Sequence, residues 1–286
     1  MKYKILFILA IQNVIYNIIV YQGHISFNII SVLLISELSR MMVSTCIYLL
    51  YYNNKPQQTK SWDKIIIPAF VGFIEHNTLF YGMTYLPPTT FQIIYQFHIL
   101  FGAILSPHHL TKKQHLSIIM LTLGLVSILY DNDISIQSTQ FKGIIFTLMG
   151  TAADAIASTK IEKIVKEPAS SIWMKQMQLS SLGVMSNLIA LILNQNDFFY
   201  GFNWYVITII TLQTMGSIII PFVLKYADNV TRGVANSLSM LIAIVVSKVI
   251  YYWKPPFHFY FGATLIFTAI FLYHKPTIKK STILTV

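Results

Sequence analysis

Residues 225–239 read KYADNVTRGVANSLS and place polar and basic side chains at the start of a hydrophobic segment. Arg232, Asn236 and Ser239 are spaced i, i+4 and i+7, so a helix presents them on one face. A guanidinium binds phosphate bidentately, while an amide and a hydroxyl both donate and accept hydrogen bonds. Polar groups persist in lipid mainly where they meet a partner, a cavity or a ligand. The segment is therefore the first place to look for function.

A second polar face has the same spacing earlier in the chain. Phe91, Tyr95 and His98 also follow the i, i+4, i+7 pattern, and the halves of the chain echo each other at an offset of 141 residues (Phe91 to Arg232). We expect the two faces to line one central cavity. Ordinary hydrogen bonding between membrane helices is the alternative interpretation.

Other ionisable residues interrupt hydrophobic segments. Glu37 and Arg40 are three residues apart, so they can form an ion pair on one helix face. Glu75 and His76 lie in mid-segment, and a charged Glu75 needs a partner such as His76, His98 or Arg40. A proton-responsive role for Glu75 and His76 is also open, since histidine titrates near neutrality. The sequence assigns no role to Asp154.

The elements that position these residues are membrane-spanning helices. Hydrophobic residues make up 55% of the chain and charged residues only 10%, too little charge to cover a soluble domain. A membrane-spanning helix needs roughly 20 apolar residues, and ten apolar runs come near that length: 5–22, 30–52, 64–85, 89–106, 115–130, 143–160, 172–193, 204–224, 233–252 and 258–273. The sequence predicts an all-α polytopic protein with ten transmembrane helices and one transmembrane domain over residues 1–286.

The charges predict the orientation of this bundle. With the N-terminus in the cytosol, the cytosolic side receives fifteen cationic side chains: Lys2, Lys4, Lys55, Lys60, Lys64, Lys112, Lys113, Lys160, Lys163, Lys166, Lys225, Arg232, Lys275, Lys279 and Lys280. The opposite loops contain only one cationic side chain, Lys254. These loops lie at about 23–29, 86–88, 131–139, 194–203 and 253–257. This asymmetry follows the positive-inside rule and places both termini in the cytosol. The basic charge thus reflects topology, and we expect no binding of nucleic acid.

The repeat halves, about 1–135 and 136–286, hold five predicted helices each. An odd number inverts the second copy in the membrane, and inverted repeats with a central site are typical of secondary transporters. The single cysteine, Cys46, excludes a disulfide framework. Short loops, together with the absence of HExxH and GxSxG sequences, argue against an enzyme.

Several blocks of the sequence now identify a family. They are Lys225-Tyr226-Ala227-Asp228-Asn229 followed by Arg232-Gly233, Thr89-Thr90-Phe91-Gln92-Ile93-Ile94-Tyr95-Gln96, Ile161-Glu162-Lys163 followed by Ser171-Ile172-Trp173, and Glu37-Leu38-Ser39-Arg40. Over nearly its whole length, the chain resembles the nucleotide-sugar transporters. Within them it is similar to the CMP-sialic acid, UDP-galactose and UDP-N-acetylglucosamine branch of the drug/metabolite transporter superfamily.

The resemblance implies an antiporter of the Golgi or ER membrane. It would exchange a cytosolic nucleotide sugar, a UDP-sugar before CMP-sialic acid, for a lumenal nucleoside monophosphate. The implied contacts are Arg232 and Arg40 for phosphate, Tyr95 and Phe91 for stacking, and Asn236 and Ser237 for hydrogen bonds to base or ribose, with His98, Glu75, His76 and Lys225 completing the substrate-binding set. No metal or redox cofactor is implied.

Several positions depart from the family pattern. His98 replaces a lysine, Phe91 replaces a tyrosine, and Glu75-His76-Asn77 replaces Gln-Asn-Asn. Two alternatives therefore stay open: a repurposed carrier of another small metabolite, and a non-transporting member that scaffolds or regulates other membrane proteins. The sequence also leaves a homo-oligomer open.

Overall fold

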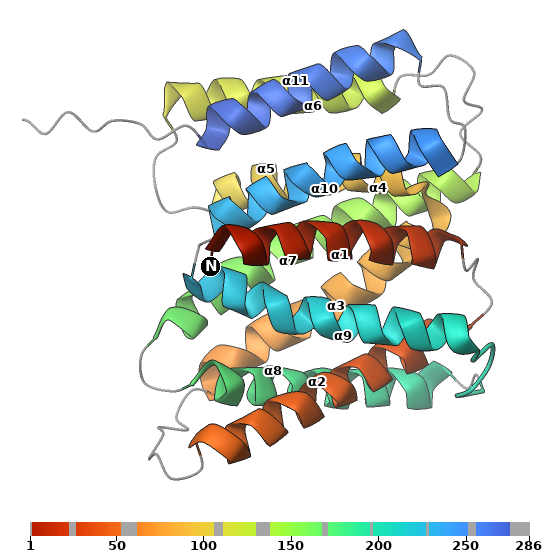
Figure 1. Cartoon of the computed structure of the whole chain (residues 1–286), viewed down its shortest axis with the longest axis vertical. Coiled ribbons are helices and arrows are strands. Elements are labelled where there is room, and N and C mark those ends of the chain that lie inside the picture. The colour runs from red at the N-terminus through yellow and green to blue at the C-terminus, as the bar shows by residue number, and fades with distance from the viewer. Residues whose placement is uncertain are drawn as a thin grey trace, which may run out of the picture. The chain divides into compact units, whose positions relative to one another are not determined.

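The computed structural model describes residues 2–22, 27–52, 62–105, 111–129, 138–167, 171–194, 197–226, 229–250 and 256–274. These residues are almost entirely helical. Their helices are α1 Lys2–Gln22, α2 Ile29–Tyr52, α3 Trp62–Tyr85, α4 Pro88–Tyr95, α5 Phe97–Leu105, α6 Lys112–Leu129, α7 Ser138–Lys166, α8 Ile172–Asn194, α9 Trp204–Tyr226, α10 Asn229–Ile250 and α11 Phe257–His274 (Figure 1).

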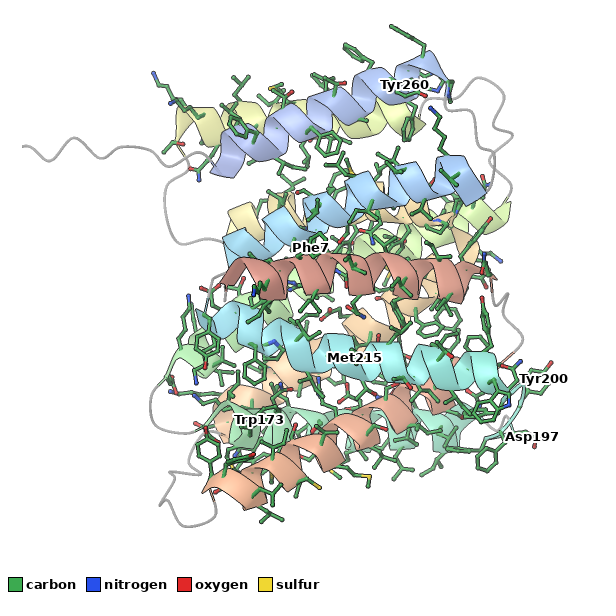
Figure 2. All side chains as sticks on the ribbon, in the orientation of Figure 1. Phe7, Trp173, Asp197, Tyr200, Met215 and Tyr260 are labelled. Atoms are coloured by element: carbon green, nitrogen blue, oxygen red, sulfur yellow. The ribbon has the colours of Figure 1, made fainter. Side chains whose placement is uncertain are left out.

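The predicted segments coincide with these helices, and the prediction of an all-α fold is confirmed. Among the described residues, six helices are long and apolar enough to cross a membrane, namely α1, α2, α3, α7, α8 and α9. Large apolar side chains are exposed on their outer faces, among them Phe7 and Met215 (Figure 2). An apolar exterior of this kind fits contact with lipid rather than water. The count of ten spans stays a prediction.

The fourth predicted segment differs in detail, because it is divided into α4 and α5 at Gln96. The Gln96 N–H donates to the Ile93 carbonyl at 3.1 Å, and the Ile99 N–H donates to the Gln96 carbonyl at 3.0 Å. These three-residue hydrogen bonds tighten the helix locally and interrupt the regular pattern. The Gln96 side chain donates to the Asn236 carbonyl of α10 at 3.2 Å, which fixes the break against a neighbouring helix.

The chain forms two compact units, and the larger contains α1 to α5 and α7 to α10. In this unit α3 packs along α7, α2 packs along α8, and α1 contacts both α9 and α10. Buried polar side chains join the helices. Gln12 donates to the Leu212 carbonyl at 3.0 Å and Ser239 to the Ala10 carbonyl at 3.1 Å. Such hydrogen bonds are a usual source of cohesion between membrane helices.

The second unit contains α6 and α11. These helices approach closely at Gly124, where a Cβ atom would lie 2.7 Å from the Gly262 carbonyl oxygen. Ser127 donates a hydrogen bond to the His258 carbonyl at 3.0 Å. A small residue and an interhelical hydrogen bond therefore hold this helix pair together.

The helix directions in the larger unit gather basic residues at one end. The ends of α2, α7 and α9 and the starts of α3, α8 and α10 lie on the left of Figure 1. That end carries Lys64, Lys160, Lys163, Lys166 and Lys225, whereas Lys142 and Lys248 belong to the opposite helix ends. Six further lysines of the predicted asymmetry lie outside the described residues: Lys55, Lys60, Lys254, Lys275, Lys279 and Lys280.

The close contact between α3 and α7 depends on small residues. A Cβ atom on Gly82 would lie 2.3 Å from Thr147 Oγ1 and 3.3 Å from Thr147 Cα, a backbone atom. We expect Gly82→Ala to lower the free energy of unfolding by about 1–3 kcal/mol, because the two helices must separate. Thermal unfolding in detergent measures the effect.

Gly72, also on α3, is the matched control, since a Cβ atom there would meet nothing within 4 Å. Gly72→Ala should unfold at or above the wild-type temperature, because alanine favours the helix by roughly 0.5–1 kcal/mol. Equal unfolding temperatures for the two variants would contradict the packing described here.

Candidate functional site

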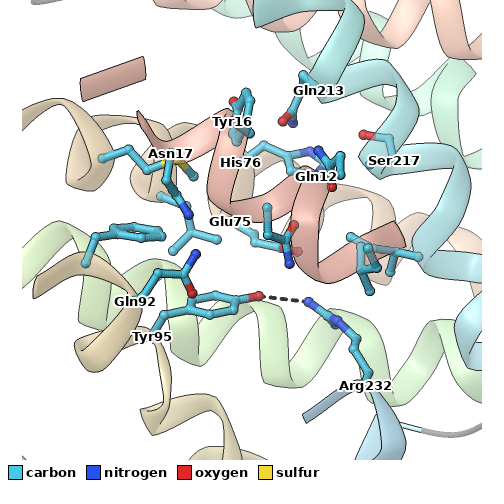
Figure 3. A pocket seen from close by; sticks show the side chains of 17 residues that line it. Gln12, Tyr16, Asn17, Glu75, His76, Gln92, Tyr95, Gln213, Ser217 and Arg232 are labelled. Carbon is cyan, nitrogen blue, oxygen red and sulfur yellow. Dashed lines mark hydrogen bonds between the residues drawn. The ribbon is translucent and has the colours of Figure 1, made fainter. Parts of the chain in front are cut away.

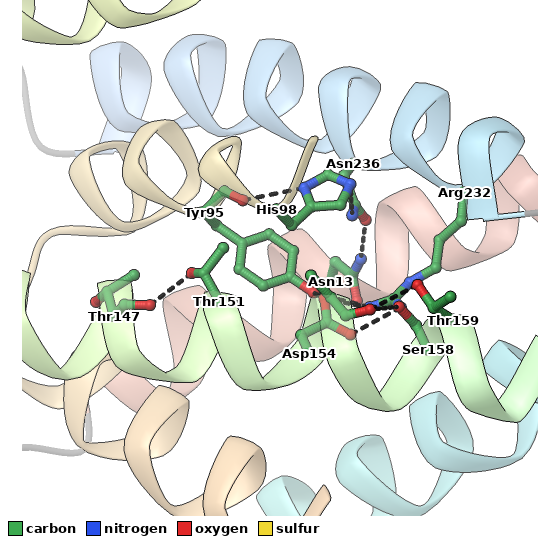
Figure 4. A network of polar contacts seen from close by, with 11 residues as sticks. Asn13, Tyr95, His98, Thr147, Thr151, Asp154, Ser158, Thr159, Arg232 and Asn236 are labelled. Carbon is green, nitrogen blue, oxygen red and sulfur yellow. Dashed lines mark hydrogen bonds and ion pairs between the residues drawn. The ribbon is translucent and has the colours of Figure 1, made fainter. Parts of the chain in front are cut away.

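A buried ion pair between Arg232 of α10 and Asp154 of α7 lies at the centre of the larger unit. Arg232 Nη1 donates to Asp154 Oδ1 and Arg232 Nη2 donates to Asp154 Oδ2, both at 2.8 Å (Figure 4). Each residue is 2% exposed. This is the paired geometry in which a guanidinium binds a carboxylate or a phosphate most strongly.

Tyr95 of α4 brings a third helix into this contact. Its hydroxyl donates to Asp154 Oδ2 and accepts a hydrogen bond from Arg232 Nη2 at 2.8 Å. The Tyr95 ring stacks on Phe91, one turn earlier, with ring centroids 5.9 Å apart and planes inclined by 12°. The spacing of Phe91 and Tyr95 in the sequence therefore produces one aromatic face beside the ion pair.

His98 lies behind Tyr95. Its ring stacks on the Tyr95 ring at 5.4 Å, and its Nδ1 lies 3.0 Å from the Tyr95 carbonyl oxygen. The amide nitrogen of Asn236 lies 3.5 Å from His98 Nε2, and Asn13 of α1 donates to the Asn236 side chain at 3.4 Å. An Nδ1–H tautomer satisfies both His98 contacts, since Nδ1 then donates and Nε2 accepts. These contacts hold the His98 ring against Tyr95.

Two cavities adjoin the ion pair. The first has a volume of about 80 Å³ and the second about 60 Å³. Arg232, Glu75, His76, Ser217 and Ile220 line both cavities and so form the wall between them. Pockets for small molecules usually have at least roughly 300 Å³, so a ligand of nucleotide size requires the two cavities to widen or join.

The first cavity is lined with carboxamides. They come from α1, α4 and α9: Gln12, Asn13, Asn17, Gln92 and Gln213 (Figure 3). Gln12 Oε1 and Asn17 Oδ1 are buried and have no hydrogen-bond partner within the described part of the chain. A buried acceptor without a donor is uncommon and calls for a water molecule or a ligand.

The second cavity is lined with charged groups. Arg40 Nη2 lies 2.6 Å from Glu37 Oε2, which confirms the predicted pair on α2, and His76 Nδ1 lies 3.6 Å from Glu37 Oε1. Glu75 is within electrostatic reach of Asp154 and Arg232. Within the part of the chain that the structure describes, no cluster of three or more His, Cys, Asp or Glu residues could hold a metal ion.

The structure brings six of the predicted site residues to the cavities. Arg232, Glu75 and His76 line both, Tyr95 and Phe91 line the first, and Arg40 lines the second.

The other four do not line either cavity: His98, Asn236, Ser237 and Lys225. Ser237 donates to the Gly233 carbonyl of its own helix at 2.8 Å. Lys225 lies near the end of α9, with Nζ 5.5 Å from the centre of the Tyr226 ring. Ligand contacts for these four residues stay predictions.

Sequence reasoning missed the role of Asp154 and the polar face of α1. Gln12, Asn13 and Asn17 recur within a turn and a half of an otherwise apolar helix. That spacing was the available signal, since polar side chains in a membrane helix mark an inward face.

Comparison with known proteins defines the class. The family described as nucleotide-sugar transporter matches residues 1–274 of this chain. The chain therefore belongs to the nucleotide-sugar transporter family, and the resemblance seen in its motifs is confirmed.

Particular relatives show the same class. The chain is 32% identical to the UDP-N-acetylglucosamine transporter of Homo sapiens, over 77% of this chain and 72% of that protein. It is 28% identical to the UDP-galactose transporter of Schizosaccharomyces pombe, over 77% of this chain and 67% of that protein. A solved crystal structure superposes with a TM-score of 0.59, covering 93% of this chain and 97% of that chain. At 10% identity this last likeness shows the fold alone.

The ion pair predicts non-additive effects on stability. Asp154→Leu and Arg232→Met each leave a buried charge without its partner, a change that costs about 3–5 kcal/mol. The double variant removes both charges and should lose much less than the sum of the single losses. Thermal unfolding of the four proteins in detergent measures this coupling.

Glu162 and Lys166 form the control pair, since they are ion-paired on the exposed end of α7. The same substitutions there should change stability by at most about 1 kcal/mol. Additive losses at Asp154 and Arg232 would contradict the buried pair.

Proposed function

We propose that this protein exchanges a cytosolic nucleotide sugar for a lumenal nucleoside monophosphate by alternating access, with UDP-sugars as its substrates. Membership of the nucleotide-sugar transporter family supports this, as do the UDP-sugar names of the relatives. One observation carries the assignment of the site: the Arg232 guanidinium is buried in the wall that the two cavities share.

The charged cavity suits the phosphates. A guanidinium binds phosphate oxygens bidentately, and Arg232 already holds two carboxylate oxygens in that arrangement. Arg40, which also lines the second cavity, is the second cation for the phosphates. A nucleotide sugar carries its charge in the middle of the molecule, so phosphates held at Arg232 and in the second cavity leave the first cavity for one of the neutral ends.

The amide-lined cavity suits a neutral, hydrogen-bonding group. Asn17 Oδ1 and Gln12 Oε1 need donors, which the hydroxyl groups of a sugar or the N–H of a base supply. Phe91 and Tyr95 line the same cavity and offer aromatic surface for stacking. The charged cavity thus matches the phosphates of a nucleotide sugar, and the amide-lined cavity matches one of its neutral ends.

The order of helix contacts supports an inverted repeat of five helices. If α1 corresponds to α7 and α3 to α9, the contact between α3 and α7 requires one between α9 and α1, and both occur. The contact of α3 with α8 is matched in the same way by that of α2 with α9. We infer ten spans, rocking halves and cytosolic termini from this pairing and from the basic helix ends. The membrane would be that of the Golgi or the ER, as for transporters that feed glycosylation.

A carrier of another small metabolite is the second candidate. Asp154 pairs with Arg232 and Glu37 pairs with Arg40, so the site is less positive than its arginines alone would make it. The ligand panel below distinguishes the two candidates.

Loss of the phosphate cation should abolish exchange. The variant Arg232→Gln/Asp154→Asn removes both charges of the pair, so neither is left buried without the other and we expect the fold to be retained. In proteoliposomes loaded with UMP, we expect its uptake of UDP-N-acetylglucosamine to fall at least about 100-fold, as after loss of a charge-assisted phosphate contact.

Lys248→Gln is the control, because it removes one exposed charge from the far end of the same helix. A panel of UDP-, CMP- and GDP-sugars identifies the base in the wild type. Unchanged saturable uptake by the double variant would contradict the assignment of Arg232, and wild-type uptake of none of these compounds would favour the second candidate.

The amide cavity predicts a change of affinity without loss of transport. Asn17→Leu removes a buried acceptor from α1, which should raise KM for the UDP-sugar about tenfold and leave the maximal rate close to wild type. Gln22→Leu, at the exposed end of α1, is the control. Equal KM values for wild type and Asn17→Leu would exclude this cavity from the ligand site.

A further inference from the structure

The counterion of Arg232 is provided by the protein itself, inside the candidate site. Asp154 comes from the middle of α7, and Arg232 comes from the first turns of α10, 78 residues further along the chain. Both side chains line the second cavity. The protein alone therefore neutralises the cation that we assign to the substrate's phosphate.

Asp154 occupies the donors that a phosphate would use. Its two oxygens each accept a hydrogen bond of 2.8 Å from a different terminal nitrogen of Arg232. A phosphate binds arginine through the same pair of nitrogens. Asp154 and the phosphate consequently compete for one guanidinium.

Tyr95 makes this exchange of partners feasible. Its hydroxyl donates to Asp154 Oδ2, so the carboxylate retains a hydrogen-bond donor when the guanidinium turns to a phosphate. The Tyr95 hydroxyl also accepts from Arg232, which keeps the three groups within reach of one another. Neither charge then has to be buried without any partner.

The presence of this counterion affects how a carrier changes sides. A buried cation that only the cargo neutralises makes the unloaded carrier costly to reorient, because desolvation of the charge is not offset. Such a carrier is restricted to exchange, in which each reorientation is made with cargo. When the protein itself provides a counterion, the charge of the cation is balanced in the unloaded carrier as well.

We propose that Asp154 is a positioning residue that substitutes for the substrate's phosphate on Arg232 and thereby lets the unloaded carrier change sides. The inference rests on the proposed function and adds a second mode to it. Exchange is the faster mode, and net movement of nucleotide sugar in one direction occurs without return cargo.

The substitution Asp154→Asn separates these modes. Asparagine has nearly the same shape and still accepts one hydrogen bond from Arg232, but it carries no charge. We expect KM to fall, because the competing carboxylate is gone. Exchange should continue, while net movement should fall at least about tenfold relative to exchange, because Arg232 in the unloaded carrier has lost its paired carboxylate.

The experiment uses the full chain in proteoliposomes loaded with radiolabelled UDP-N-acetylglucosamine. Efflux is measured into buffer alone for net movement and into buffer with UMP for exchange, and the ratio of the two rates is compared between proteins. Glu162→Gln, which removes a carboxylate from the exposed ion pair of the same helix, is the matched control and should keep the wild-type ratio.

Two results would overturn the proposal. One is a wild-type protein that releases label only when UMP is outside, and the other is an Asp154→Asn variant with the wild-type ratio. If Asp154→Asn does not fold, the wild-type ratio decides alone. Failure of wild-type exchange with every nucleotide sugar would instead contradict the proposed function, so the two failures are distinguishable.

Discussion

The buried ion pair of Arg232 and Asp154 is the interaction on which the rest of the site depends. A charge in the interior of a helix bundle is tolerated only with a partner and with its remaining hydrogen bonds satisfied. Here the partner comes from a different helix, and the Tyr95 hydroxyl from a third helix contacts both charges. The relative positions of α4, α7 and α10 are therefore tied to one guanidinium.

Different kinds of polar side chain line the two cavities beside this pair. Uncharged amides of α1, α4 and α9 line the first cavity, whereas Arg40, Glu37 and Asp154 line the second. Their common wall contains Arg232, Glu75 and His76. A ligand with an anionic centre and a neutral, hydroxyl-bearing end matches that division. Because the cavities together are smaller than a typical ligand pocket, the bundle must open for such a ligand. We propose that the Asp154 carboxylate balances the charge of Arg232 while it does so.

Much of the helix pattern could be predicted from the sequence, because the length of an apolar segment alone indicates whether it can span a membrane as a helix. The face spacing likewise predicted that Arg232, Tyr95 and Phe91 line a cavity, which they do, and the i, i+3 spacing predicted the pair of Glu37 and Arg40.

The partner of Arg232 could not be predicted in this way. Asp154 is 78 residues distant, and only the packing of α7 against α4 and α10 brings it within reach. Helical spacing relates residues of one helix and contains no information on which helices meet. The same limit applies to His98, whose contact with Asn236 of α10 depends on helix packing and not on spacing within one helix.

The position of the phosphate in a complex with UDP tests the central claim most directly. A cryo-EM structure of that complex should place phosphate oxygens within about 3 Å of the terminal nitrogens of Arg232, with at least one hydrogen bond from Arg232 to Asp154 released. A phosphate bound elsewhere, with both hydrogen bonds between Arg232 and Asp154 intact, would contradict the account.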